Sequence, residues 1–269
     1  MTKNFNMGDV HFWHSYDEHV NPANFYRHCH EFYEIIYVLQ GTGRYVVEGN
    51  ECKLCKNTMM IFRPHEYHYV NLTADQPYER YVLYFDRDFL TGWSEELVEH
   101  FENSPHGEGN FYSAADMPIS LLSIFEKFDS LQNVPTEQAH KLARFFLSEL
   151  LVLLSLADPQ VNVRENEPLG ARVIKYLNDN ISSPISLDEL AKNFYVSKFY
   201  LCRAFKAYNG ISIVGYLNGK RAMLAKGMIE NGETAANAAF RVGFGDYSSF
   251  YRAYKKALGH SPKNTSADE

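Results

Sequence analysis

The stretch TAANAAFRVGFGDYSSFYRAYKKALGHSP, residues 234–262, decides the fold of the last third of this chain. A segment rich in small residues comes first, then the short Val242-Gly243-Phe244 turn, then a segment with aromatic residues at 250 and 254. Small residues let a second helix cross the first closely, and glycine suits the short turn between them. The pattern predicts a helix-turn-helix whose second helix buries Phe250 and Tyr254.

A second copy of this pattern lies about 49 residues earlier, in SLDELAKNFYVSKFYLCRAFKAYNG, residues 186–210. Leu190 and Ala191 precede its turn, and Leu201 and Phe205 take the inward positions of its second helix. The sequence between the copies predicts one helix over about residues 213–230, roughly 27 Å long at 1.5 Å per residue. A spacer of that length suits two recognition helices placed about one DNA turn, ~34 Å, apart.

Charge divides the chain at a similar place. Residues 168–269 contain 14 Lys and Arg against 8 Asp and Glu, a net charge of +6, whereas the residues before them carry −13 of the total of −7. A domain with a net positive charge is suited to binding the phosphates of a nucleic acid. Uneven solvation of the two parts is an alternative explanation of the charge difference. The polar, proline-containing residues 158–167 are predicted to be a linker. It would separate a first domain, 1–157, from a second, 168–269.

Residues from about 170 to 264 resemble the DNA-binding domain of the AraC/XylS family of bacterial transcription regulators. The resemblance is carried by ISLDELAKNFYVSKFYLCRAFKAYNG, YLNGKRAMLAKGMI and AAFRVGFGDYSSFYRAYKKALGHSP. It implies binding to double-stranded DNA through the outward side chains of both second helices. Arginine can bridge guanine O6 and N7, and lysine neutralises phosphate. The expected DNA-binding residues are Lys198, Phe199, Cys202, Arg203, Lys206, Tyr247, Ser248, Arg252 and Lys255.

Residues 10–88 are predicted to be rich in strands, because Tyr, Phe, Ile and Val dominate a series of short runs. FYEIIYVLQGTGRYVVEG, residues 32–49, predicts a hairpin around residues 40–43. A short helix is expected from Ser94, as its N-cap, and two longer helices over 117–132 and 137–156. The last of these has an apolar stripe made of Leu142, Phe145, Phe146, Leu150, Leu153 and Leu154.

The stretch RHCHEFYE, residues 27–34, bears on function. His28-x-His30-x3-Glu34-x6-Gly41 matches the first cupin motif, and Pro64-x3-His68-x2-Asn71 partly matches the second. Regulators of this family often carry a cupin-like effector barrel before the DNA-binding domain, and the N-terminal part resembles one. The expected fold is therefore α+β, with a cupin-like β-barrel and helical extension followed by an all-α double helix-turn-helix domain.

Even-numbered residues of one strand share a face, so His28, His30 and Glu34 are expected to point into the barrel, where His68 can join them. Three interpretations remain open. The favoured one is an organic effector, often a sugar in this family, bound without metal or other cofactor. The others are a divalent transition metal and ordinary core histidines. The expected effector-binding residues are His28, His30, Glu34, His68, Arg44 and Trp13.

Two function classes compete on these patterns. A ligand-responsive transcription regulator uses both the barrel residues and the tandem helix-turn-helix, whereas a metal-dependent cupin enzyme has no use for the second helix-turn-helix. A DNA-binding protein without effector is a third possibility, but its barrel would be apolar. We therefore expect a regulator and not an enzyme. We also expect a homodimer, formed through the barrel or through residues 139–156.

The compartment expected is the cytoplasm. No run of 18 apolar residues is present to cross a membrane, and the start does not follow the signal-peptide pattern. The four cysteines fit this compartment as thiols. Cys52 and Cys55 form a single CxxC pair, which is a weak zinc signal without a second pair.

Overall fold

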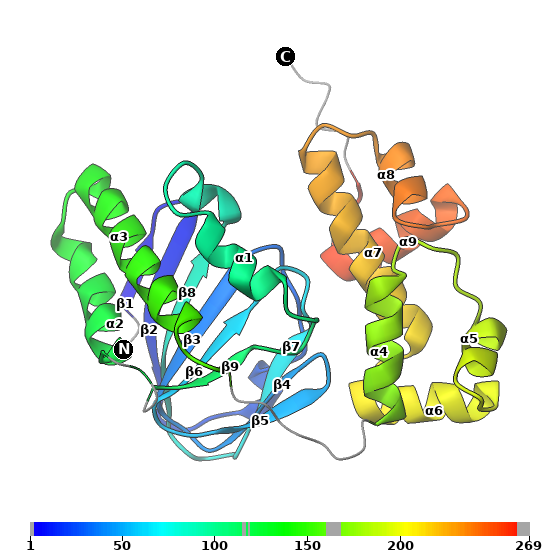
Figure 1. The fold of residues 1–269 in the computed structure, drawn as a ribbon, viewed down its shortest axis with the longest axis horizontal. Helices are drawn as coiled ribbons and strands as arrows, with labels where there is room; N and C mark the ends of the chain where they lie inside the picture. The colour runs from blue at the N-terminus through cyan, green and yellow to red at the C-terminus, as the bar shows by residue number, and fades with distance from the viewer. Residues whose placement is uncertain (1–2, 115–116, 118, 160–167, 263–269) are drawn as a thin grey trace. The chain divides into compact units, whose positions relative to one another are not determined.

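The structure is a computed structural model that describes residues 3–114, 117, 119–159 and 168–262, with backbone only for 3–5. The chain divides into two compact units, residues 1–163 and 164–269, which are described separately (Figure 1). Most of the predicted linker, residues 160–167, lies outside the described residues. No helix in the part described is both long and apolar enough to cross a membrane.

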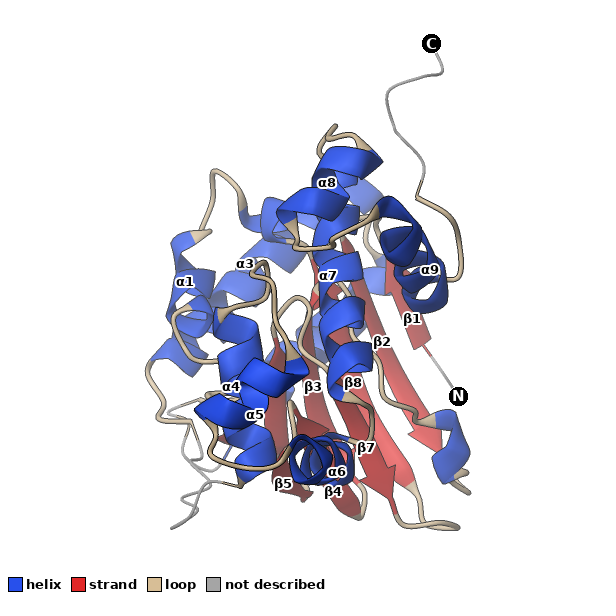
Figure 2. Cartoon of the chain, turned by 90° about the vertical axis from the view of Figure 1, so that its right-hand side faces the viewer, coloured by secondary structure: helices blue, strands red, loops and turns tan. Residues whose placement is uncertain are grey.

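Two antiparallel sheets form the first unit (Figure 2). The larger has six strands in the order β1-β2-β8-β3-β6-β9, and the smaller has three in the order β5-β4-β7. With the helices that follow, they give the predicted α+β fold. The strands are β1 Lys3–Asn6, β2 Val10–Asp17, β3 Tyr33–Gln40, β4 Gly43–Val47, β5 Asn50–Leu54, β6 Thr58–Phe62, β7 His68–Leu72, β8 Tyr78–Phe85 and β9 Phe111–Ser113.

Successive side chains of a strand face opposite sides of the sheet, and the two sides belong to two different cores. On β3, Ile35 and Tyr37 belong to a core shared with three helices, whereas Ile36 and Val38 belong to a core between the sheets. Glu34 shares its face of the strand with Ile36, so its carboxylate lies between the sheets. The helices that cover the outer face are α1 Glu96–Glu102, α2 Leu121–Ser130 and α3 Thr136–Ser155.

The predicted hairpin at residues 40–43 is wrong. β3 pairs with β6 and β8, whereas β4 pairs with β5 and β7, so the chain crosses here from one sheet to the other. At Gly43 a Cβ atom would lie only 2.1 Å from the carbonyl oxygen of Asn71. The tight hairpin joins β4 to β5 instead, where Glu48 and Gly49 take φ values of 47° and 85°. Two consecutive positive φ values are the requirement of a type I′ turn.

Two details of the helical extension also differ from the prediction. Ser94 does not cap α1, because Glu95 occupies the cap position and the Ser94 hydroxyl is hydrogen-bonded to that of Ser148 at 2.6 Å. The predicted stripe on α3 is buried only in part, since Phe145 is 53% exposed. The buried face of α3 is instead Ala139, Ala143, Leu147, Leu150, Leu151, Leu153 and Leu154.

The described elements of the second unit are all helices, and they begin close to the predicted residues. Local capping explains this agreement. Ser197, Ser212, Thr234 and Asp246 each accept a hydrogen bond from a backbone N–H in the first turn of the following helix. The helices are α4 Leu169–Asp179, α5 Leu187–Asn193, α6 Lys198–Asn209, α7 Ile213–Glu230, α8 Ala235–Arg241 and α9 Tyr247–Leu258.

Each helix-turn-helix has one left-handed residue in its turn. Gly243, after α8, has a φ of 93°, and Tyr195, after α5, has a φ of 56°. A Cβ atom at Gly243 would lie 2.6 Å from the carbonyl oxygen of Ser182, so this turn needs glycine for space as well as for its φ. Tyr195 is 95% exposed, and its side chain therefore has room.

Gly243→Ala should lower the free energy of unfolding by about 1–3 kcal/mol, the usual cost of a residue held in an unfavourable backbone conformation. Gly227 is the matched control, because it lies inside α7 and has no atom within 4 Å of a built Cβ. Gly227→Ala should raise the free energy of unfolding by about 0.5–1 kcal/mol. Urea denaturation of the full chain measures both, and equal effects would contradict the close approach at Gly243.

A buried ion pair joins the turn between β6 and β7 to the loop after α1. Arg63 Nε donates to Glu66 Oε1 at 3.0 Å, and Arg63 Nη1 donates to the Phe101 carbonyl at 2.7 Å. Glu66 also accepts from the Gly107 backbone N–H at 2.8 Å and from Asn110 Nδ2 at 2.7 Å. Burial alone would raise the pKa of Glu66, but the charge and hydrogen bonds of Arg63, together with His106 and the Gly107 N–H, outweigh it and lower that pKa to about 2.

Arg63→Ala should cost about 3–5 kcal/mol of stability at pH 7, because it leaves the Glu66 charge buried without its cation. Arg44→Ala is the control, since it removes an exposed pair with Glu51 and should cost less than about 1 kcal/mol. Glu66 ionises more readily when folded. Its stabilisation is therefore complete above its usual pKa of 4.5 and is lost as pH falls towards about 2. Denaturation at pH 7, 5 and 3 tests both points, and similar losses for the two variants would contradict them.

Candidate functional site

Four polar side chains converge in the core between the two sheets: His28, His30, Glu34 and His68. One carboxylate oxygen, Glu34 Oε2, lies 3.0 Å from His30 Nε2 and 3.0 Å from His68 Nε2. One potential ligand atom from each residue lies within 4.8 Å of the other three. Within the described part of the chain, this is the only group of three or more such side chains found close enough to hold a metal ion.

The two N-terminal histidines reach this cluster without lying on a long strand. β3 begins at Tyr33, so the prediction that His28 and His30 share a strand with Glu34 is wrong. His28 instead forms an isolated backbone bridge with His68, with N···O distances of 3.1 and 3.0 Å. The His65 N–H donates to the His30 carbonyl at 2.7 Å. Pairing with the start of β7, rather than strand alternation, therefore brings the histidines to Glu34.

All three imidazole rings are oriented in the same way by the backbone. Each ring places Nδ1 against a carbonyl oxygen, which can only accept a hydrogen bond. Nδ1 therefore carries hydrogen in each ring. In His30 and His68, Nε2 is the atom that approaches Glu34. The Nδ1 contacts are His28 to Tyr26 O at 2.9 Å, His30 to Phe32 O at 3.0 Å and His68 to Glu66 O at 2.8 Å.

The carboxylate at the centre of the cluster is buried and ionised. Glu34 is 4% exposed and His68 is 2% exposed. Burial alone would raise the pKa of Glu34, but hydrogen bonds and charge from His30 and His68 hold it well below its usual range. Burial, helped by the neighbouring His68, lowers the pKa of His28. His28 is therefore a neutral imidazole at pH 7 and can act as a ligand through nitrogen.

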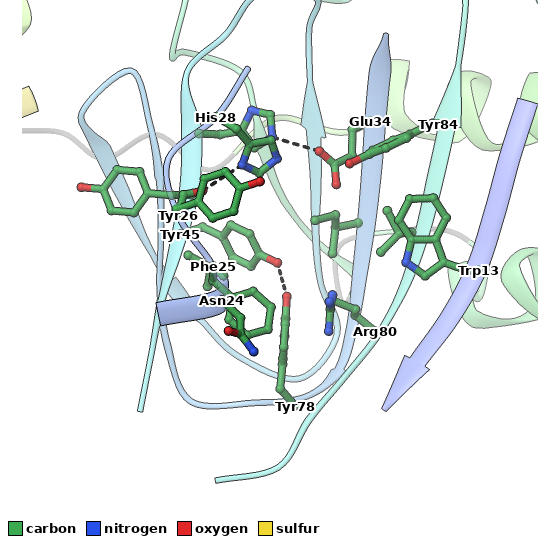
Figure 3. Close-up of a pocket in the computed structure, with 15 residues that line it drawn as sticks. Trp13, Asn24, Phe25, Tyr26, His28, Glu34, Tyr45, Tyr78, Arg80 and Tyr84 are labelled. Carbon is green, nitrogen blue, oxygen red and sulfur yellow. Dashed lines mark hydrogen bonds and ion pairs between the residues drawn. The ribbon is translucent and has the colours of Figure 1, made fainter. Parts of the chain in front are cut away.

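A cavity of about 240 Å³ lies beside the cluster (Figure 3). The Tyr45 and Tyr78 hydroxyls are hydrogen-bonded to each other in its wall. Arg80 Nη1 donates to Asp17 Oδ2 at 3.0 Å. The walls combine aromatic rings with a few polar groups, as small-molecule sites do. The lining residues with polar or aromatic side chains are Trp13, Asn24, Phe25, Tyr26, His28, Glu34, Tyr45, His68, Tyr69, Tyr78, Arg80 and Tyr84.

Of the six residues expected to bind effector, the structure places four on the cavity wall: Trp13, His28, Glu34 and His68. His30 lies behind that wall, bonded to Glu34. Arg44 does not line this cavity. Arg44 lies on the opposite face of β4 from Tyr45, and its side chain is 67% exposed and paired with Glu51 at 2.8 Å.

Sequence reasoning missed the other polar and aromatic wall residues, of which Tyr45, Tyr78, Arg80 and Tyr84 lie on strands. Three of them are even-numbered residues of β8, and Val82 between them also lines the cavity. The alternation of residues in YERYVLYF was the available signal, because every second side chain of a strand faces the same way.

The second helices of the two helix-turn-helix motifs, α6 and α9, bury the predicted anchors. Leu201 and Phe205 are buried on α6, and Phe250 and Tyr254 on α9. Cys202 is half-buried, so it is less available than expected. The other expected DNA-binding side chains are exposed: Lys198, Phe199, Arg203, Lys206, Tyr247, Ser248, Arg252 and Lys255.

Several of these exposed side chains already have partners. Lys198 Nζ is 2.9 Å from Asp188 Oδ2. The Arg203 guanidinium lies 5.8 Å from the centre of the Phe199 ring. These partners are exposed as well, so the groups remain accessible to a ligand. Both helices therefore present cationic and aromatic groups on the side away from their anchors.

Comparison with known proteins agrees with this division of the chain. Residues 14–155, more than half of the sequence, match the family model of the AraC-like ligand binding domain. Residues 190–268 match a helix-turn-helix domain. The HTH-type transcriptional activator RhaS of Escherichia coli O139:H28 is 26% identical over 248 residues, covering 90% of this chain and 87% of the relative. RhaS of Escherichia coli strain K12 / DH10B has the same identity and coverage.

Two solved structures are also similar. The C-terminal domain of AraT, a response regulator from Geobacillus stearothermophilus, is 31% identical, with a TM-score of 0.34 over 36% of this chain and 81% of that one. ToxT from Vibrio cholerae O395 is 9% identical, with a TM-score of 0.40 over 95% of this chain and 96% of that one.

The two family matches fall on the two units, with the cavity in the first and the tandem helix-turn-helix in the second. Both domains and the RhaS relatives indicate a transcription regulator rather than a cupin enzyme. The chain belongs to the AraC family of DNA-binding transcription regulators, with a cupin-like ligand-binding domain at its N-terminal end.

Proposed function

We propose that this regulator responds to a small polar molecule of the carbohydrate class, bound in the cavity beside Glu34. The observation that carries the proposal is the mixture of groups in the cavity wall. Tyrosine hydroxyls, imidazoles and a guanidinium offer hydrogen bonds to ligand hydroxyls, and Trp13 offers a flat apolar face. The cavity volume of about 240 Å³ suits a small molecule rather than a drug-sized one.

An apolar effector fits this cavity less well. It would cover Glu34 and Arg80 without offering either of them a hydrogen bond, and covering polar groups in this way is costly. A molecule with several hydroxyl groups satisfies them. The site therefore favours a polar effector.

The proposed DNA contacts come from both second helices. Phe199 and Arg203 on α6, and Tyr247, Ser248 and Arg252 on α9, are proposed to meet base edges. Lys198, Lys206 and Lys255 are proposed to meet phosphate. Cys202 is a minor contributor, because it is half-buried and offers only a weak donor. We also propose that the regulator acts in the cytoplasm, because bacterial DNA is located there.

Homodimer formation is the proposed state on DNA. An exposed apolar face on α3 and its C-cap residue supports it, made of Phe145, Val152 and Leu156. The exposed Trp93 packs edge-on against Phe145, with ring centres 4.7 Å apart. Apolar patches of this kind mark contact surfaces. Sedimentation should show a dimer for the wild type and a monomer for Phe145→Glu. Lys53→Glu, a charge reversal on the exposed face of β5, should remain dimeric.

Arg203→Ala and Arg252→Ala should each weaken binding to the specific site by about 1–3 kcal/mol and relax the preference at one base pair. Lys255→Ala should weaken binding to all sequences alike and flatten the salt dependence. Lys175, exposed on α4, provides the control, and Lys175→Ala should leave sequence preference unchanged. Fluorescence anisotropy with selected and scrambled DNA measures these effects. Wild-type affinity in both arginine variants would contradict reading by the two helices.

Tryptophan fluorescence should report the effector directly, because the chain has only two tryptophans. Trp13 lines the cavity and Trp93 lies on the exposed face near α3. In Trp93→Phe, a sugar or sugar acid selected by thermal shift should change the emission of Trp13. In Trp13→Phe, the same ligand should leave the emission unchanged and bind roughly 2- to 10-fold more weakly, as expected for a smaller aromatic contact. If the ligand changed the emission of Trp13→Phe but not that of Trp93→Phe, the effector would bind outside this cavity.

A further inference from the structure

We propose that Arg221 sets the spacing at which the two helix-turn-helix motifs read DNA, because it fixes one motif against the other. Arg221 is a positioning residue in this role. It acts through α6 and α9 and does not itself meet DNA. This inference rests on the proposed DNA contacts from both of these helices, and it adds what holds the helices at one distance and angle.

Arg221 is a buried cation near the middle of α7. The residue is 6% exposed, and burial lowers the pKa of its guanidinium. Nε donates to the Ile181 carbonyl at 2.8 Å, and Nη2 donates to the Ser183 carbonyl at 2.6 Å. Both carbonyls belong to the loop between α4 and α5, which leads into the first motif. Burying a charge is costly unless hydrogen bonds compensate it, so this pair of bonds ties the loop firmly to α7.

The same guanidinium contacts the turn of the second motif. Its central carbon lies 5.8 Å from the centre of the Phe244 ring, within the range of a cation–π contact. A Cβ atom at Gly243 would lie 3.0 Å from Arg221 Nη2 and 2.6 Å from the Ser182 carbonyl oxygen. The turn of the second motif therefore lies directly against the loop of the first, and Arg221 contacts both.

Helix α7 also joins the two motifs near its start. The Tyr216 hydroxyl donates to Asn178 Oδ1 of α4 at 2.8 Å, and the Tyr216 ring packs edge-on against Phe205 of α6, with ring centres 5.7 Å apart. The later part of α7 shares a core with α8 and α9. Contacts at Tyr216 alone would let the first motif rotate about them. Arg221 adds a second attachment ~7.5 Å farther along the helix and so fixes the angle between α6 and α9.

Arginine suits this role better than other residues. Its planar guanidinium can donate in two directions and pack against an aromatic ring at the same time, whereas the lysine ammonium is a point charge on a flexible stem. Methionine would fill much of the same space but would remove the donors to Ile181 and Ser183. Replacing Arg221 with methionine should therefore loosen one motif against the other while the core of each motif stays intact.

The spacing of the DNA site is what a fixed angle controls. One base pair added between two half-sites rotates one of them by about 35° and moves it by ~3.4 Å relative to the other. Two recognition helices held rigidly cannot follow this change, so one of them loses its base contacts. Two loosely joined helices can follow it in part.

The test uses the full chain and a DNA site selected from random sequence. The variants Arg203→Ala and Arg252→Ala identify the base pairs read by α6 and α9, and thus the two halves of the site of one chain. One base pair added or removed between the halves should weaken wild-type binding ~5- to 150-fold, the worth of one well-placed arginine–base contact. Fluorescence anisotropy measures this spacing ratio.

In Arg221→Met the spacing ratio should fall at least ~3-fold, because each motif can then keep its own contacts. Affinity for the original site should fall as well, since ordering the two motifs becomes part of binding. Arg241→Met is the matched control. It makes the same substitution in the second motif, but the Arg241 side chain is 63% exposed and pairs with Glu233 at 2.8 Å. This control should keep the wild-type ratio.

A merely structural role has a different signature. If Arg221→Met binds every spacing more weakly by the same factor, so that the ratio stays at the wild-type value, the proposal is overturned. If circular dichroism shows that Arg221→Met does not fold, Gly243→Ala decides. Its methyl group displaces the same loop at the Ser182 carbonyl without changing Arg221, so it should lower the spacing ratio too. An unchanged ratio in Gly243→Ala then overturns the proposal.

Failure of this inference and failure of the proposed DNA contacts are distinguishable. If both arginine variants relax base preference but the wild type tolerates the added or removed base pair, the role of Arg221 is overturned and the proposed contacts stand. If neither arginine variant changes base preference, the proposed contacts from α6 and α9 fail, and the inference fails with them.

Discussion

The ion pair between Arg63 and Glu66 is the constraint on which the effector site depends. A buried ion pair is tolerable only when its remaining N–H groups and lone pairs are satisfied. Here the guanidinium donates to the Phe101 carbonyl at the end of α1 and to the Pro105 carbonyl in the loop after it, and the carboxylate accepts from Gly107 and Asn110. This network holds the turn between β6 and β7. The Glu66 carbonyl in that turn orients the His68 ring, and the His65 N–H holds the backbone at His30. Two of the four clustered side chains therefore take their positions from one ion pair.

In the six-stranded sheet, successive side chains of a strand face opposite sides. One face of the sheet contributes to stability and the other to ligand recognition. Residues such as Ile35 on β3 and Leu83 on β8 pack against α1–α3, whereas Glu34 and Arg80, on the other face of the same strands, reach the cavity. Helices can thus seal one face without closing the pocket on the other. Burying Glu34 on this face costs free energy, because its charge lies beside the apolar side chains of Ile36 and Val38. Partners around the carboxylate offset that cost, and this requirement explains why the histidines gather there rather than elsewhere in the core.

Sequence reasoning succeeded where local interactions decide the structure. The six helices after residue 168 begin within a residue or so of the prediction, because a capping side chain precedes most of them and periodic anchors such as Leu201 and Phe250 follow. It failed where tertiary contacts decide. Nothing local shows that the chain changes sheets before Gly43, or that His28 pairs with His68. The cluster was predicted from its residue types, but by the wrong geometry. Arg80 and Tyr84 were missed because alternation was applied to the stretch with histidines and not to β8.

The opposite charges of the two parts of the chain set different conditions for their ligands. Residues 168–269 carry +6, so DNA is attracted to the part that presents α6 and α9, while the −13 before them repels phosphate and cannot compete for it. An acidic domain is also a poor host for an anionic effector. Charges farther away than about 8 Å are largely screened at physiological salt, however, whereas groups inside a buried pocket act on the ligand at close range. The charge that matters for the effector is therefore the local one.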